Sequence, residues 1–252
     1  MTAGTFPLSK PFREFAHRVC PATTFVVDTA AERLIIANAV SAVVFLLIGG
    51  TIALLIALTR WQAVHLMNAV WYYRLVTAHG ISMLVAWVVF FEVAGLYFGS
   101  TVMLNARMVS PAGGWAAWGL MLVGSLTAAF MVLVGPVVGL DSSDVMFTAY
   151  VPLKAHPLFY LGVILFAVGA LLATILFFVN IVVAKREQRY EGSLPLVVYG
   201  LLTAAIIAVY TLVEGAIAFV PAFLWSLGVL PNVDPGLYRN FFWGFGHPAQ
   251  QI

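Results

Sequence analysis

Long runs of apolar residues, separated by short polar connections, dominate this chain of 252 residues. A helix needs about 20 predominantly apolar residues to cross the hydrocarbon of a bilayer. Five runs are long enough, and they cover residues 34–58, 75–98, 113–139, 156–183 and 196–227. The pattern predicts an all-α polytopic membrane protein with five complete transmembrane helices.

A sixth apolar run begins near Asn240 and extends to Ile252, where the sequence stops. At a rise of about 1.5 Å per residue, it would cover about 20 Å of a hydrocarbon layer that is about 30 Å thick. We expect it to be the start of a sixth helix whose remainder lies in a further segment or in a separate chain. The predicted division is a cytoplasmic N-terminal segment, 1–33, and a transmembrane domain, 34–252, that is incomplete at its C-terminus.

The composition excludes a soluble protein, because 63% of the residues are hydrophobic and only 9% are charged. The net charge of +2 gives no reason to expect a nucleic-acid partner, so membrane lipid is the expected environment. The single cysteine, Cys20, excludes an internal disulfide.

The distribution of Lys and Arg predicts the orientation, since these residues are more frequent on the cytoplasmic side. With the N-terminus inside, four cations fall in outer segments: Arg60, Arg74, Lys154 and Arg239. The inner segments then hold twice as many: Lys10, Arg13, Arg18, Arg33, Arg107, Lys185, Arg186 and Arg189. We therefore expect a multi-pass protein of the inner (cytoplasmic) membrane with its N-terminus inside.

Two histidines fall at a similar depth in separate spans. His79 follows Arg74 in the second span, and His247 follows Arg239 in the sixth, so both lie near the predicted outer side. Imidazole is a good ligand for iron and copper, and Gly80 beside His79 would let a flat macrocycle approach the backbone. Two unrelated histidines bonded to helix carbonyls would give the same pattern, so the residues alone leave both interpretations open.

Two carboxyl groups, Glu92 and Glu214, fall inside apolar spans. Hydrocarbon favours the neutral form of a carboxyl group, which can carry a proton or serve as a hydrogen-bonded packing residue. The residues alone do not separate these two roles.

Four short motifs, in this order, resemble the catalytic subunit of the heme-copper oxidase superfamily, and its B-type branch in particular. They are Thr77-Ala-His-Gly80, Pro152-Leu-Lys-Ala-His-Pro-Leu-Phe-Tyr-Leu-Gly162, Val233-Asp-Pro235 and Phe242-Trp-Gly-Phe-Gly-His-Pro248. The resemblance begins near residue 30 and extends over nearly the whole chain. It implies the N-terminal half of a subunit I bundle.

The resemblance implies three cofactors: a low-spin heme, a high-spin heme and copper. It makes His79 an axial ligand of the low-spin heme and His247 a copper ligand, and it places Trp243 beside the copper site. The family's other histidine ligands lie on later helices. We therefore expect a companion segment or chain that carries them, and an electron donor at the outer face, which is a donor subunit or a cytochrome c-like or cupredoxin protein.

One departure from the family pattern bears on the reaction. Oxidases of the B-type branch have a tyrosine four residues after the copper histidine, and this chain has Gln251 there. Because that tyrosine supplies an electron and a proton when O2 is split, its replacement favours reduction of NO to N2O. Reduction of O2 to water, with a tyrosine from another helix, is the alternative. A transport or assembly protein without catalytic activity is an alternative of another class.

Proton transfer to the reaction would then use polar groups inside the spans. The candidates are Glu92, Glu214, Thr203 and Tyr210.

Overall fold

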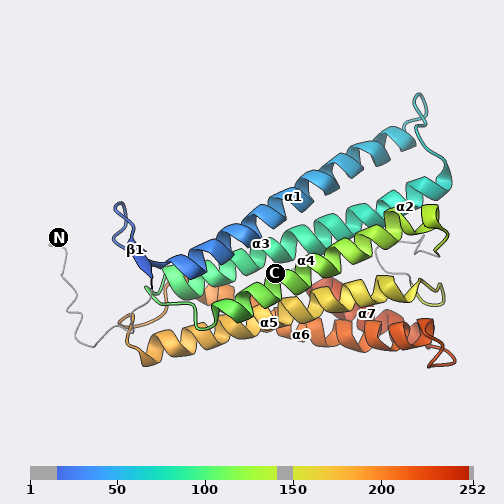
Figure 1. Ribbon diagram of the computed structural model, residues 1–252. Helices are drawn as coiled ribbons and strands as arrows, with labels where there is room; N and C mark the ends of the chain where they lie inside the picture. Colours follow the sequence, from blue (N-terminus) through green and yellow to red (C-terminus); the bar gives the residue numbers. More distant parts are fainter. Residues whose placement is uncertain (1–15, 141–149, 250–252) are drawn as a thin grey trace.

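Five long helices lie side by side in a bundle (Figure 1). This computed structural model describes residues 16–140 and 150–249. Within that part of the chain, five segments are long and apolar enough to cross a membrane, which confirms the five predicted spans. They are Thr29–Arg60, Ala69–Val102, Pro111–Leu133, Pro157–Arg186 and Leu196–Ser226.

The second span is a helix with two wider sections. It consists, in order, of α2 (Ala69–Gly80), the π-helical η1 (Ile81–Trp87), α3 (Val88–Tyr97) and the π-helical η2 (Phe98–Val102). Wider turns inside an α-helix occur often at functional sites. Because η1 begins two residues after His79, the backbone geometry changes next to the predicted heme ligand.

The other four spans are single helices, whose bounds are α1 (Thr29–Arg60), α4 (Pro111–Leu133), α5 (Pro157–Arg186) and α6 (Leu196–Ser226). The first begins before the predicted residue 34, because the Asp28 side chain accepts a hydrogen bond from the main-chain N–H of Ala30 and caps the helix. The third ends before the predicted residue 139. Pro136 cannot continue the hydrogen-bond ladder, and the short 3-10 helix η3 (Gly135–Val138) follows instead.

The sixth helix, α7 (Pro235–Ala249), begins five residues before the predicted start at Asn240. The Asp234 carboxylate accepts a hydrogen bond of 2.6 Å from the main-chain N–H of Leu237. Pro235 takes the first helical position, where an N–H would have no partner within the helix. The Asp-Pro pair is therefore a helix start that hydropathy alone does not reveal.

A small antiparallel sheet precedes the first span and adds the only strands of the described residues to the predicted all-α fold. It pairs β1 (His17–Val19) with β2 (Val26–Asp28). The sheet lies at the end of the bundle where α1 begins (Figure 1), which we call the N-terminal end. The other end, where α2 and α7 begin, is called the opposite end.

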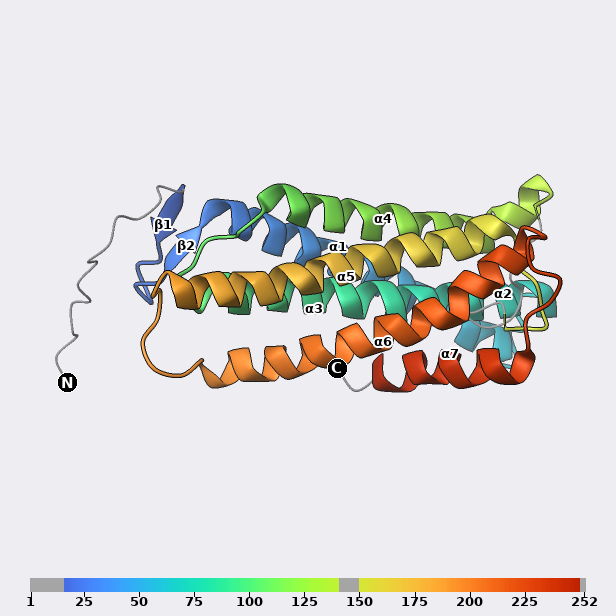
Figure 2. The same ribbon diagram turned by 90° about the horizontal axis from the view of Figure 1, so that it is seen from below.

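The α4 and α5 helices pack so closely that their main chains touch. A Cβ added at Gly124 would lie 2.5 Å from the carbonyl oxygen of Gly162, and one added at Gly162 would lie 2.8 Å from the main-chain nitrogen of Ala128. Small residues of this kind let membrane helices approach closely. On the other side of the bundle, α7 packs along α6 (Figure 2).

Candidate functional site

The His79 ring lies between the first two spans. The side chain is half-buried, and its Nδ1 lies 3.0 Å from the main-chain carbonyl oxygen of Gly49 in α1. A carbonyl can only accept, so Nδ1 carries the proton and donates it. The lone pair of His79 then resides on Nε2, to which no described residue bonds. A histidine held in this way is oriented to bind a metal through Nε2.

Gly49 was not singled out from the sequence, although it provides the carbonyl that orients His79. A Cβ at this position would lie 2.5 Å from Sδ of Met83 and 3.2 Å from Cβ of Ser82. The missing side chain therefore lets α1 approach the second span. The adjacent glycines Gly49 and Gly50 in the middle of an apolar run were the signal in the sequence, because glycine is unfavourable inside a helix unless close packing requires it.

Gly80 is buried beside His79, at the last position of α2. Its proposed use, an open approach for a flat macrocycle, stays a prediction.

His247 lies on α7 and is exposed on the surface of the described chain. Trp243, one turn earlier, is 41% exposed. The opposite face of α7 is aromatic and packs inward, where Tyr238 and Phe242 are almost fully buried and Phe245 packs against Phe219. The predicted copper ligand thus points away from the aromatic contact that anchors its helix.

The two histidines are at similar depth. The helices α2 and α7 begin at the same end of the bundle (Figure 2). At a rise of about 1.5 Å per residue, His79 is about 15 Å into α2 and His247 is about 18 Å into α7. Their helices have different main packing partners, because α2 packs mostly on α1 and α4 and α7 packs mostly on α6, although the buried faces of α2 and α7 contribute to the same apolar core.

Within residues 16–140 and 150–249, no group of three or more His, Cys, Asp or Glu side chains could hold a metal ion. Gln251, the position of the expected tyrosine, lies outside the described residues. Within the described residues, the two predicted ligands are therefore isolated imidazoles, and a heme or copper site at either one would require further ligands.

The predicted proton carriers separate into two groups. Three of them lie on α6. The Glu214 carboxyl lies against α7, where its Oε2 would be 3.0 Å from a Cβ added at Gly244, and it interacts with Tyr210 one turn away. Tyr210 is 53% exposed, and the exposed Thr203 donates its hydroxyl proton to the carbonyl of Tyr199.

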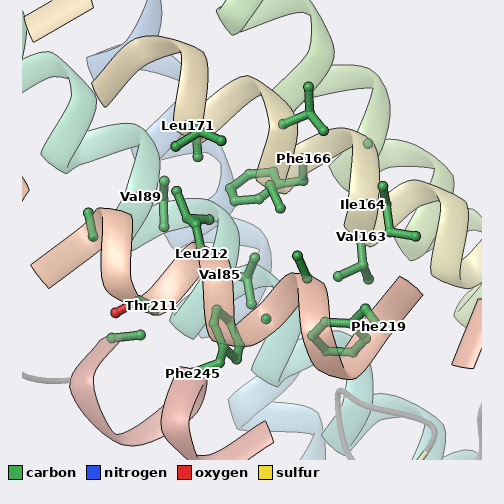
Figure 3. Close-up of a pocket in the computed structure, with 18 of the residues that line it drawn as sticks. Val85, Val89, Val163, Ile164, Phe166, Leu171, Thr211, Leu212, Phe219 and Phe245 are labelled. Carbon is green, nitrogen blue, oxygen red and sulfur yellow. The ribbon is translucent and has the colours of Figure 1, made fainter. Parts of the chain in front are cut away.

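Glu92 belongs to a different part of the molecule. It lines a partly open cavity of about 220 Å³ between the second span, α4, α5, α6 and α7 (Figure 3), and some of the side chains in its wall are also exposed on the outside of the described chain. Most of the wall is apolar, and Phe166, Leu212 and Phe245 contribute to it. The structure thus does not bring Glu92 together with the three candidates on α6.

The comparisons with known proteins agree with this arrangement. Residues 33–252 match the family described as Cytochrome C and Quinol oxidase polypeptide I. Cytochrome c oxidase subunit 1 of Thermus thermophilus is 27% identical over 188 residues, which are 70% of this chain and 30% of that protein. A solved structure of a heme-copper terminal oxidase dimer matches with a TM-score of 0.76 and 27% identity, over 88% of this chain and 38% of that chain.

The family match includes both candidate ligands and all five spans except the first four residues of α1. The chain nevertheless spans only about a third of the length of these two relatives, at 30% and 38%. The predicted resemblance is confirmed at the level of the superfamily, whereas the B-type branch and the reaction stay predictions. With its five-span bundle and a family match over nearly its whole length, the chain belongs to the cytochrome c and quinol oxidase polypeptide I family.

Proposed function

We propose that this chain supplies part of the catalytic core of a membrane heme-copper oxidoreductase that reduces NO to N2O. Family membership supports an oxidoreductase over the transport or assembly alternative. The observation that favours NO is Gln251, which occupies the position of the expected tyrosine.

The His79 geometry fits a heme ligand. Its Nδ1–H donates to the Gly49 carbonyl, and Nε2 has no partner among the described residues. When bound, the low-spin heme would pass electrons toward the reaction site. The chain's own part is to hold one imidazole in a fixed orientation, and this hydrogen bond also makes the imidazole a stronger electron donor to the metal.

His247 fits a copper ligand by its residue type and its place. It is exposed on α7, so ligands from a companion segment or chain have access to it. Trp243 lies on the same face one turn earlier, where a planar ring can fill the space beside the metal and exclude water. A high-spin heme would complete the site with ligands that this chain does not provide.

The two reactions differ in what they require of the protein. Two molecules of NO accept two electrons and two protons and give N2O and water, without a tyrosyl radical. One O2 accepts four electrons and four protons and gives two waters. A glutamine side chain can donate and accept hydrogen bonds but does not supply the additional electron, so position 251 favours the NO reaction.

Reduction of O2 is the second candidate. The two relatives are described as a cytochrome c oxidase subunit and a heme-copper terminal oxidase, which favours O2. A tyrosine on a helix outside this chain would then take the role that Gln251 cannot.

The expected setting is the inner membrane with the N-terminus in the cytoplasm. Electrons would arrive at the opposite end, from a donor subunit or from a cytochrome c-like or cupredoxin donor, because His79 and His247 lie nearer that end. Glu214, Tyr210 and Thr203 would serve proton transfer along the exposed face of α6.

The experiment is turnover with NO and with O2 on the same purified complex, together with measurement of its heme and copper content. We expect N2O production to exceed O2 consumption. Faster O2 reduction would support the oxidase instead, and a complex without heme and copper would refute both.

A further inference from the structure

One carboxyl oxygen of Glu92 has no hydrogen-bond partner among the described residues. Its Oε1 is buried, and no described residue forms a hydrogen bond with it. A buried polar atom left in this state costs about 1–3 kcal/mol. Because native structures keep few such atoms, we expect a partner outside the described residues, and water is the partner that the adjoining cavity can hold.

The cavity beside Glu92 has room for that partner. Its volume of about 220 Å³ is enough for several water molecules, each of which needs about 10–15 Å³ measured in this way. Figure 3 shows the Thr211 hydroxyl at its edge among the apolar side chains. Water in a mainly apolar cavity requires polar groups at fixed places, and the cavity contains four.

Three hydroxyl groups from three helices share the cavity with Glu92: Ser125 of α4, Thr174 of α5 and Thr211 of α6. Each donates its proton to the carbonyl four residues earlier on its own helix. Each hydroxyl oxygen can therefore only accept a hydrogen bond from a molecule in the cavity. A water molecule can donate to such a lone pair and can also hydrogen-bond to the unpartnered Glu92 oxygen.

Further polar groups continue toward the N-terminal end. Asn180 is 1% exposed and lies about 9 Å beyond Thr174 along α5. Its Nδ2 donates to the Ser100 hydroxyl at 3.3 Å. The Tyr97 hydroxyl, between Glu92 and Ser100 on the second span, is also buried without a partner among the described residues.

We propose that Glu92 is a proton-exchanging carboxyl group, supplied through water in this cavity from the N-terminal end of the bundle. The proton on its O–H passes to a neighbouring water, and a proton from the next water replaces it, so that atoms and charge balance. The inference rests on the proposed function, because reduction of either NO or O2 consumes protons inside the membrane. The proposal assigns this role to Glu92 and not to Glu214, which lies against α7 and does not line the cavity.

The test is infrared spectroscopy of the resting complex in H2O and after transfer to D2O. A protonated carboxyl has a carbonyl stretching band that shifts when its proton is replaced by deuterium. We expect a band that disappears in Glu92→Gln, remains in Glu214→Gln, and shifts in D2O within seconds. Thr174→Val, which replaces a hydroxyl with a methyl group, should slow that shift at least about tenfold.

Three results would overturn the inference: a band that does not shift over hours, a band that persists in Glu92→Gln, or an unchanged exchange rate in Thr174→Val. Because Thr174→Val keeps the side-chain volume, it tests the route even if Glu92→Gln does not fold. The infrared measurement does not depend on catalytic turnover. A wild-type complex that reduces NO can therefore still give a result that refutes the role of Glu92. The measurement can also succeed in a complex whose heme and copper content refutes the proposed function.

Discussion

Nδ1 of His79 and the main-chain carbonyl oxygen of Gly49 form a hydrogen bond of 3.0 Å between the first two spans. It requires close packing of α1 on η1, which the absence of a side chain at Gly49 permits. The orientation of the imidazole thus depends on the packing of the two helices, so a change in the packing should alter the spectrum of the low-spin heme that we propose at His79.

Gly49→Ala tests this relationship. The new Cβ would collide with the Met83 side chain, which would have to shift, and would lie 3.2 Å from Cβ of Ser82, so the contact between α1 and η1 would loosen. A weaker hydrogen bond makes His79 a poorer electron donor, so we expect about tenfold weaker heme retention and a higher reduction potential of the low-spin heme. Gly50→Ala is the matched control, since nothing lies within 4 Å of its added Cβ. Equal potentials in the two variants would contradict the role of Gly49.

His79→Ala should abolish the low-spin heme signal in the optical spectrum of the reduced complex, because the variant lacks the imidazole that we propose as an axial iron ligand. His65→Ala, at an exposed position in the connection after α1, should leave the spectrum unchanged. A low-spin signal that survives in His79→Ala would rule out this ligand assignment.

His247→Ala should lower the copper content at least about tenfold, as measured by elemental analysis, while the low-spin heme signal is kept. The control is His156→Asn. The Nδ1 atom of His156 accepts from the main-chain N–H of Leu158 and caps α5, and asparagine is a good replacement at a helix start. If copper is retained in His247→Ala, this residue is not the copper ligand.

Gly124→Ala should destabilise the bundle by about 1–3 kcal/mol, because the new methyl group would meet main-chain atoms of α5 that cannot move aside. Thermal unfolding of the purified complex in detergent measures the effect. Gly119→Ala, on the same helix with nothing within 4 Å, should be neutral or slightly stabilising. Similar melting temperatures for both variants would show that the α4–α5 contact does not limit stability.

Glu187, at the N-terminal end, should make stability depend on pH. It accepts hydrogen bonds from Arg107 at 3.2 Å and Arg189 at 2.9 Å. Burial raises the pKa of this carboxyl, but the hydrogen bonds and charges of the two guanidinium groups outweigh that effect and lower the pKa overall. The stabilisation is therefore complete above the unfolded pKa of about 4.3 and is lost as the pH falls through the lower folded value.

Glu187→Gln should accordingly cost about 0.5–1 kcal/mol at neutral pH and reduce the loss of stability in acid. Thermal unfolding at a series of pH values provides the measurement, and Glu191→Gln, at an exposed position, serves as the control. If the stability of Glu187→Gln falls with decreasing pH in the same way as that of the wild type, Glu187 is not the source of this pH dependence.

The sequence predicts much of this protein because bilayer thickness constrains it strongly. Only a helix satisfies its own main-chain hydrogen bonds in hydrocarbon, so long apolar runs must be spanning helices. The ends of the helices were less predictable. They depend on individual hydrogen bonds, such as those of Asp28 before α1 and Asp234 before α7, which a hydropathy pattern does not record.

For the candidate site, the sequence itself gives the residue types. It also predicts the similar depth of His79 and His247, because the depth of a residue in a spanning helix follows from the number of residues between it and the start of the helix. The partner of His79, the separation of Glu92 from Glu214, and the outward position of His247 depend on which helix faces which neighbour. That choice is made by close contacts between small residues such as Gly49 and Gly124, and it brings together groups far apart in the sequence. The sequence alone determined the spans and the candidate ligands, whereas only the tertiary structure decided which side chains share an environment, because helix packing is a property of surfaces in contact.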